Sequence, residues 1–193
     1  MGYKKKLLVT VFGAFAAAGS MQVQAEPSAA MLANTCAGCH GTDGKSVGPA
    51  SPNLAGMSEA YFIDTMLAFK SGDRQSTIMG RIAKGYTEGQ IESMAGFFAS
   101  KPVYMASQKL DAKQAKAGAK SYDKACSKCH DENGGLPDDD SGILAGQWLP
   151  YLQYSMEDFA GGHRDQPKKM KKAVKKLSDD ELQAVLTFFA SQK

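Results

Sequence analysis

Apolar residues recur with helical spacing near the end of each half of this 193-residue chain. In the first half they stand at positions i, i+3, i+4 and i+7, which is the pattern of an amphipathic helix: Ile91, Met94, Ala95 and Phe98. In the second half the same spacing is found at Leu182, Val185, Leu186 and Phe189. The two stripes therefore predict one core-facing helix at the end of each half.

Each of these helices is preceded by a sequence that caps a helix. Thr87 and Gln90 form one capping box, and Ser178 and Glu181 form the other. Further helices are predicted around 60–69 and 150–159, and segments rich in Gly and Pro, such as 47–52, separate the helices. A methionine-bearing loop is predicted between the middle and the last helix of each half, around Met79 and Met170. Because no segment alternates polar and apolar residues as a half-buried strand does, the predicted fold class is all-α.

The two halves are repeats of each other. An offset of 90 residues relates Leu54-Ala55-Gly56 to 144–146, Tyr61 to Tyr151 and Phe69 to Phe159. Near the end of each half the offset becomes 91, where Phe97-Phe98-Ala99-Ser100 matches 188–191. The repeat predicts two similar domains, 26–105 and 106–193, with a linker at 101–107.

The first 25 residues have the composition of a cleaved signal peptide. Lys4–Lys6 precede a short apolar segment from Leu7 to Gly19, and Val23-Gln24-Ala25 ends it with a small-residue cleavage pattern. An uncleaved N-terminal anchor is the alternative. Export predicts a mature chain that begins near Glu26 and works in the periplasm. Without the three lysines the chain has 20 basic and 20 acidic residues, so its charge does not favour a nucleic-acid partner.

All four cysteines lie in two copies of one motif. These are Cys36-Ala37-Gly38-Cys39-His40 and Cys126-Ser127-Lys128-Cys129-His130. The C-x-x-C-H pattern is the attachment signature of c-type haem. Two thiols one helical turn apart can bond the two vinyl groups of one porphyrin, and the histidine that follows can coordinate its iron. The motifs thus predict two covalently bound haem c groups, which would supply much of the apolar core of two small domains.

Other uses of the cysteines are possible. An exported chain with four cysteines can contain two disulfides, and a single C-x-x-C can be a redox dithiol. Four cysteines can also bind one zinc ion. That arrangement would leave the adjacent His40 and His130 without a role.

Two of the ten methionines are candidates for the second axial ligand. Met79 and Met170 lie 43 and 44 residues after the first cysteine of their motifs, and each precedes a capping box by eight residues. A thioether ligand favours ferrous iron and raises the reduction potential. Four methionines have no counterpart in the other half and are interpreted as core residues: Met57, Met66, Met94 and Met156. His163 is an alternative ligand for the second haem, although it aligns with the polar Asp73 and is interpreted as solvent-facing.

Several other residues have two interpretations. Trp148 either donates a hydrogen bond to a haem propionate or packs on the ring. Arg74 and Arg164, 90 residues apart, either neutralise propionates or lie on a solvated face, which is the favoured interpretation. Six lysines around Met170 form either a solvated surface or a surface that attracts an acidic electron acceptor: Lys168, Lys169, Lys171, Lys172, Lys175 and Lys176.

Three longer strings carry a family resemblance across the predicted mature chain. The segments Ser46–Pro52, Ser76–Tyr86 and Leu144–Tyr154 are similar to those of the dihaem cytochrome subunit of flavocytochrome c sulfide dehydrogenase. The lysine-rich segment around Met170 and the acidic run 138–140 depart from that pattern. The resemblance implies two tandem cytochrome c-like domains, each folded around one covalent haem.

The resemblance also implies partners and residue roles. A separate FAD-containing subunit would oxidise sulfide and form a heterodimer with this chain, which would pass electrons to a small soluble cytochrome and catalyse nothing itself. The implied thioether residues are Cys36, Cys39, Cys126 and Cys129, and the implied axial pairs are His40 with Met79 and His130 with Met170. A carbonyl near Pro49 is expected to accept the His40 N–H, and Pro137 is the weaker candidate for His130.

Two other function classes remain open on the sequence. A free periplasmic dihaem carrier to a terminal oxidase would have the same ligands without an obligate partner. A haem enzyme would need an exchangeable iron position or a distal acid–base group. The sequence has no fifth cysteine, and it has one candidate methionine for each iron.

Overall fold

The computed structural model describes residues 26–193, so the predicted signal peptide lies outside the described residues. The first domain contains α1 (Ala29–Asn34), α2 (Ala37–His40), the 3-10 turn η1 (Thr42–Gly44), α3 (Glu59–Ser71), α4 (Met79–Ala83) and α5 (Glu88–Ala99). The second contains α6 (Ala112–Ala125), the distorted turn α7 (Asp131–Gly134), α8 (Leu149–Gly161), α9 (Lys168–Val174) and α10 (Asp179–Ser191).

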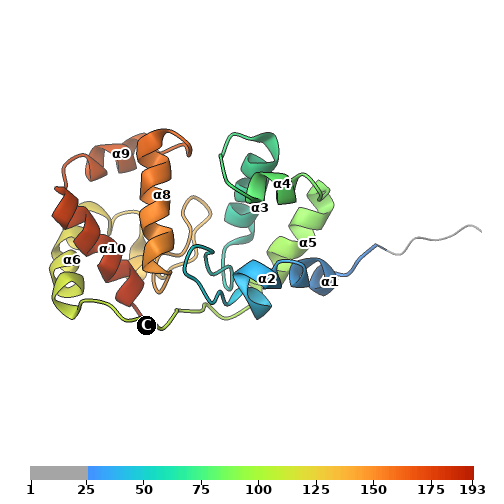
Figure 1. Ribbon diagram of the computed structural model, residues 1–193, viewed down its shortest axis with the longest axis horizontal. Coiled ribbons are helices and arrows are strands. Elements are labelled where there is room, and N and C mark those ends of the chain that lie inside the picture. The colour runs from blue at the N-terminus through green and yellow to red at the C-terminus, as the bar shows by residue number, and fades with distance from the viewer. Residues whose placement is uncertain (1–25) are drawn as a thin grey trace, which may run out of the picture.

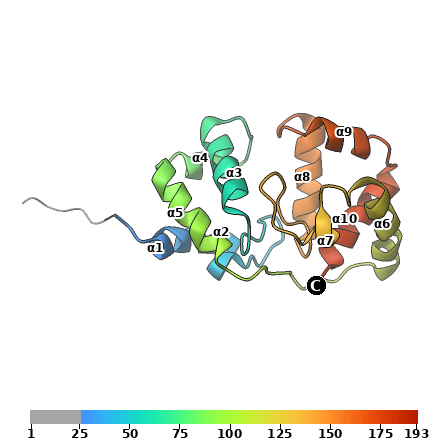
Figure 2. The same ribbon diagram turned by 180° about the vertical axis from the view of Figure 1, so that it is seen from behind.

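The described residues form two helical domains that lie side by side (Figure 1). They contain no strand, so the all-α prediction is confirmed. The extended segment between α5 and α6 runs along one edge of both domains, and the chain ends beside it (Figure 2). No helix in residues 26–193 combines the length and the apolar character that a membrane crossing requires.

The first and last helices of each domain pack together. In the first domain α1 lies against α5, and in the second α6 lies against α10. A Cβ atom on Gly118 would lie only 2.0 Å from the carbonyl oxygen of Ala184, so the absence of a side chain permits the close approach of α6 and α10. This packing brings each cysteine motif, which follows the first helix, over the core that the last helix builds.

The predicted apolar stripes form the two cores. Ile91, Met94, Ala95 and Phe98 are almost completely buried, and they join residues of α1 and α3 in the first core. In the second core Val185, Leu186 and Phe189 are buried with Tyr122 and Leu152, while Leu182 is partly buried. Both capping boxes form as predicted, because each Ser or Thr side chain and its partner Gln or Glu exchange hydrogen bonds with the backbone.

The methionine-bearing segments are helical, whereas the sequence predicted loops. Met79 is the first residue of α4, and Met170 lies inside α9. Because α4 packs against α3, this short helix is held by tertiary contacts. α9 begins after Pro167, which has no N–H and suits the start of a helix.

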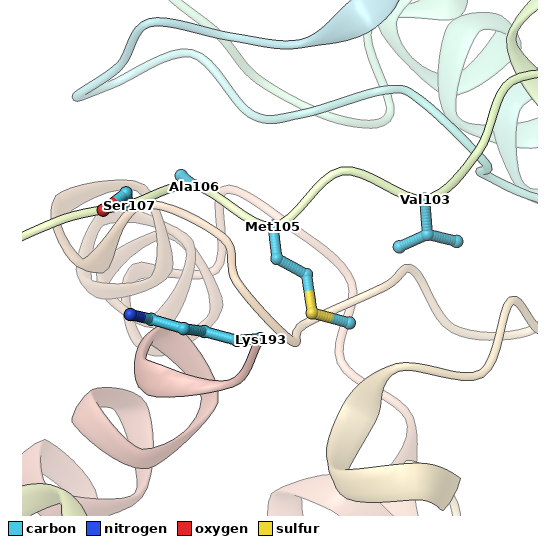
Figure 3. A pocket seen from close by; sticks show the side chains of 5 residues that line it. All are labelled: Val103, Met105, Ala106, Ser107 and Lys193. Carbon is cyan, nitrogen blue, oxygen red and sulfur yellow. The ribbon is translucent and has the colours of Figure 1, made fainter.

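A hollow with a volume of about 450 Å³ lies under the linker (Figure 3). It is lined by Val103, Met105, Ala106, Ser107 and Lys193. Because none of the cysteines, histidines or candidate methionines borders it, this hollow is not the site that the sequence motifs predict.

Candidate functional site

The first cysteine motif is wound into one helical turn. Cys36 caps α2, and Cys39 and His40 lie within it, so the His40 N–H donates to the Cys36 carbonyl at 2.9 Å. His40 is only 8% exposed, and its Nδ1 donates to the Pro52 carbonyl at 2.9 Å. This bond leaves Nε2 free to act as a metal ligand. The acceptor was expected near Pro49, and it is instead the carbonyl of Pro52, three residues later.

The second motif has the same turn with a different environment for its histidine. The His130 N–H donates to the Cys126 carbonyl at 3.0 Å, as in the first motif. Among the described residues no hydrogen bond is formed by the His130 ring, so the expected Pro137 carbonyl is not its partner. Instead the ring lies edge-on to Phe189, with centroids 6.0 Å apart. Burial lowers the pKa of His130, and the charges of Asp138 and Asp131 oppose this shift.

All four thiols are free, which excludes the disulfide interpretation for this structure. Burial raises the pKa of Cys36, and it raises that of Cys126 to about 11, with the neighbouring Cys129 adding to the effect. Thiols of redox dithiol sites have lowered pKa values because the thiolate is the nucleophile. The pKa values of Cys36 and Cys126 are therefore shifted in the direction opposite to that of a redox dithiol site.

The two motifs belong to different domains. In residues 26–193 no three His, Cys, Asp or Glu side chains come together in a way that could hold a metal ion. The zinc interpretation needs all four thiols around one ion and is therefore wrong. Each motif instead presents one half-buried and one exposed thiol beside a histidine: Cys36 and Cys39 in the first, Cys126 and Cys129 in the second.

The candidate methionines each lie on a short helix of their own domain. Met79 is half-buried and packs on the first core, and Met170 is half-buried in α9. Three methionines interpreted as core residues are buried as predicted: Met57, Met66 and Met94. His163 is exposed, as predicted, and its carbonyl accepts the Gln75 N–H of the first domain at 2.9 Å.

The interface between the domains contains contacts that the sequence did not indicate. The Gln147 side chain exchanges two hydrogen bonds with the backbone of Asn53. The Trp148 indole N–H donates to the Ser46 carbonyl at 3.1 Å, so neither sequence interpretation of Trp148 describes its hydrogen bond. A Cβ on Gly48 would lie 2.4 Å from the Trp148 ring, so only glycine permits this contact.

Arg74 and Arg164 lie at this interface, where the sequence favoured a solvated face. Both side chains are half-buried and border a cavity of about 260 Å³ between the domains. Two buried donors among the described residues have no partner: the Nε atom of Arg74, which lines this cavity, and the Nε2 atom of Gln166. Buried polar groups normally have hydrogen-bond partners, so these atoms indicate a missing acceptor.

These observations together fit two covalently attached haems. The thiols are unpaired and one turn apart, and His40 has one ring nitrogen committed and the other free. The orphaned Arg74 donor at the interface matches the carboxylate groups that a haem carries.

Comparison with known proteins supports this assignment. Residues 25–114 match the cytochrome c family model, and residues 113–189 match the model for cytochrome c oxidase, cbb3-type, subunit III. The cytochrome subunit of sulfide dehydrogenase from Chlorobaculum tepidum is 47% identical over 68 residues, which are 35% of this chain and 61% of that relative. The thiosulfate dehydrogenase electron acceptor of Thiomonas intermedia is 28% identical, covering 98% of this chain and 91% of the relative.

Cytochrome c4 is a relative matched along nearly its whole length. The protein from Pseudomonas aeruginosa is 30% identical, over 95% of this chain and 96% of the relative. The crystal structure of reduced cytochrome c4 from Pseudomonas stutzeri has the same fold, with a TM-score of 0.75 over 87% of this chain and all of the other, at 24% identity. This chain therefore belongs to the dihaem cytochrome c family that includes cytochrome c4.

Proposed function

We propose that this dihaem cytochrome is the electron-transfer subunit of a sulfide dehydrogenase. It takes electrons from a FAD-containing partner subunit, in a heterodimer, and passes them to a small soluble cytochrome. The observation that carries the electron-transfer role is the paired geometry of the motifs, in which each domain presents two free thiols beside a histidine that is buried in the first domain and half-buried in the second. The similarity to a sulfide dehydrogenase cytochrome subunit supports the choice of donor.

The residue roles follow from this geometry. Cys36 and Cys39 hold the first haem through thioether bonds, and Cys126 and Cys129 hold the second. Each haem c supplies, when bound, an iron that alternates between the ferric and ferrous states and carries one electron. The irons would be held by His40 and Met79 in the first domain and by His130 and Met170 in the second.

The chain's own residues tune the two sites differently. In the first domain the Pro52 carbonyl fixes the His40 ring and its tautomer, and hydrogen bonding of this kind makes a ligating imidazole more basic. In the second domain the ring of His130 is packed against Phe189 and has carboxylates nearby. The two irons therefore have different reduction potentials, which gives the electron a preferred direction.

The remaining parts of the proposal concern location and assembly. Residues 1–25 direct export to the periplasm, and the domains are 26–105 and 106–193. Sulfide oxidation takes place on the flavin of the partner subunit. For this reason the chain needs no catalytic residue of its own.

A lysine-rich surface in the second domain supports the proposal that the electron acceptor is acidic. All six lysines of residues 168–176 are exposed, and in the described part of the chain the only ion pair is Lys101–Asp43. Their charges are thus unpaired around Met170, the proposed ligand. Such a surface raises the encounter rate with an oppositely charged partner.

A second candidate donor is a thiosulfate dehydrogenase. The thiosulfate dehydrogenase electron acceptors of Thiomonas intermedia and Stutzerimonas stutzeri are 28% and 29% identical to this chain, and each match covers most of this chain. The residue roles would be the same, and only the donor would change.

A native pull-down of the tagged chain separates these possibilities. A flavin absorbance in the captured complex, with haem reduction on addition of sulfide, is the expected result. Capture of a flavin-free partner, with reduction by thiosulfate and not by sulfide, would overturn the sulfide assignment. A chain purified without covalent haem would overturn the electron-transfer role itself.

A further inference from the structure

The segment that carries Met79 is tied to two other parts of the first domain. The hydroxyl of Tyr86, which follows α4, lies 2.6 Å from the Oγ1 atom of Thr35, directly before the first cysteine motif. Because the Thr35 hydroxyl already donates to the Leu32 carbonyl, the Tyr86 hydroxyl is the donor in this bond. The Lys70 ammonium of α3 donates to the Tyr86 carbonyl at 2.6 Å. We call these two hydrogen bonds of Tyr86 the Tyr86 latch.

The second domain has none of the three residues that form the latch. The counterparts of Thr35, Lys70 and Tyr86 in the repeat are all aliphatic: Ala125, Ala160 and Leu177. The side chain of an aliphatic residue can form no hydrogen bond. Leu177 packs on the second core as Tyr86 packs on the first. The second domain therefore keeps the apolar contact of this position and lacks the latch.

The two methionine segments also differ in their packing. In the first domain α4 packs against α3 and buries Ala83 completely, and Met79 packs on the core. In the second domain α9 contains no fully buried residue, and Met170 is not among the described residues that pack on the core. Short helices are stable only when tertiary contacts hold them, so α9 is the less stable of the two helices.

The charges of the two helices add to this difference. Of the five residues of α4 only Arg81 is charged, whereas α9 contains four lysines. Lys168 and Lys169 stand in the first turn of α9, where the helix dipole opposes positive charge. Lys168 and Lys172 are one helical turn apart, and their like charges repel each other. The segment around Met170 therefore opens more readily than the segment around Met79.

We propose that the Met170 segment opens in the folded protein and lets a small ligand take the place of Met170 at the second iron, whereas the Tyr86 latch keeps the Met79 segment closed. This inference rests on the proposed function, because it requires both methionines to be axial ligands. Thr35, Lys70 and Tyr86 are positioning residues, since they act only through the segment that carries Met79. The lysine charges around Met170 disfavour a cation. The ligand is therefore an uncharged or anionic molecule with a nitrogen or sulfur electron pair.

The test is a titration of the ferric holoprotein with imidazole at about pH 8, where most of the imidazole is uncharged. The absorption band that reports sulfur–iron coordination measures the loss of methionine. In the wild type about half of this band should disappear at roughly tenfold lower imidazole than the other half. Single-ligand variants assign the two halves. The band that remains in Met79→Ala should be lost at the lower concentration, and the band that remains in Met170→Ala at the higher one.

Removing the latch should make the first iron accessible as well. The double variant Lys70→Ala/Tyr86→Phe removes both hydrogen bonds and keeps the aromatic ring on the first core. Opening then breaks two fewer hydrogen bonds, so the second half of the band should be lost at roughly tenfold lower imidazole than in the wild type.

A matched double variant controls for the loss of one lysine and one hydroxyl. In Lys45→Ala/Tyr154→Phe both residues are exposed, and neither side chain forms a hydrogen bond or ion pair within residues 26–193. This variant should titrate as the wild type does. Equal shifts in both double variants would overturn the role of the latch.

Amide hydrogen exchange measures the opening of the segments without reference to the iron. In the wild type residues 167–177 should exchange faster than residues 76–86. The variant Lys70→Ala/Tyr86→Phe should speed exchange in 76–86 by roughly tenfold and leave 167–177 unchanged. Equal acceleration of both segments would indicate a general loss of stability and would overturn the inference.

Haem content separates a failure of this inference from a failure of the proposed function. Mass spectrometry should find two covalent haems in the wild type and in every latch variant. A wild type with two haems whose methionines are displaced together at one imidazole concentration would reject only the difference between the segments. A wild type without covalent haem would reject the proposed function itself.

Discussion

Gln147 pairs with the backbone of Asn53 across the domain interface. Its Oε1 accepts the Asn53 N–H at 2.8 Å, and its Nε2 donates to the Asn53 carbonyl at 3.0 Å. Both residues are buried, at 2% and 3% exposure. A side-chain amide therefore satisfies backbone groups that the interface removes from water, and this makes the pair a determinant of domain docking.

The variant Gln147→Leu should weaken the docking of the domains. It leaves the Asn53 N–H and carbonyl without partners, and each buried unsatisfied group costs about 1–3 kcal/mol. Thermal unfolding of the holoprotein measures the effect. Gln153→Leu is the control, since it breaks one partly buried bond to Gln183 within the second domain. Equal melting temperatures for Gln147→Leu and the wild type would contradict this role.

Removing one pair of cysteines should remove one haem. The double variant Cys36→Ala/Cys39→Ala is expected to keep one covalent haem, and Cys126→Ala/Cys129→Ala the other, because the motifs lie in separate domains. Mass spectrometry counts the haems. Since each haem fills the core of a small domain, we also expect the domain without haem to be digested first by protease. Retention of two haems in either variant would contradict the assignment.

Replacing a proposed methionine ligand should lower the potential of one haem. For Met79→Ala or Met170→Ala we expect a decrease on the order of 0.1 V, within the range of about 0.8 V that axial ligands control. The absorption band that reports sulfur–iron coordination should decrease by about half, because one of two sites is lost.

Met94→Leu is the matched control for the methionine variants. Met94 is fully buried in the first core, so its replacement tests packing without removing a proposed ligand. A band of undiminished intensity in Met170→Ala would show that another residue ligates that iron. In that case the exposed His163 would be the first residue to test.

The lysine-rich surface of the second domain should steer an acidic redox partner. The triple variant Lys169→Gln/Lys171→Gln/Lys172→Gln is expected to slow reduction of an anionic acceptor roughly tenfold at low salt, with a smaller difference at high salt. Ferricyanide serves as the anionic probe in stopped-flow measurements.

A matched control separates local charge from net charge. Lys113, Lys116 and Lys120 are exposed on α6, and their replacement by Gln removes the same charge from a different helix. This variant should react at close to the wild-type rate. Equal slowing by both triple variants would show that the net charge of the chain, and not the surface around Met170, sets the rate.

The sequence predicted most of the local structure and missed the interface. The capping boxes at Thr87 and Ser178 and the apolar stripes depend on residues a few positions apart, so the sequence alone reveals them. The Met79 and Met170 segments were predicted as loops, because helices as short as α4 form only when tertiary contacts hold them.

The repeat showed that Arg74 and Arg164 are equivalent, but not where they point. Their environment was misjudged because a charged residue on a loop is usually solvated, whereas both arginines lie half-buried beside the cavity between the domains. The hydrogen bond of Trp148 was not foreseen for a related reason, since its partner Ser46 lies 102 positions earlier in the chain.

The cofactor chemistry, the two-domain repeat and the helical cores can all be inferred from the order of the residues. They depend on spacings within one motif or one helix, where the chain geometry leaves little freedom. Only the folded molecule reveals three other features. These are the carbonyl that accepts the His40 N–H, the hydrogen bonds by which Gln147 joins the domains, and the position of the unpaired arginine charges. These contacts join residues that are distant in the sequence, and their positions result from the packing of whole domains, which no local pattern encodes.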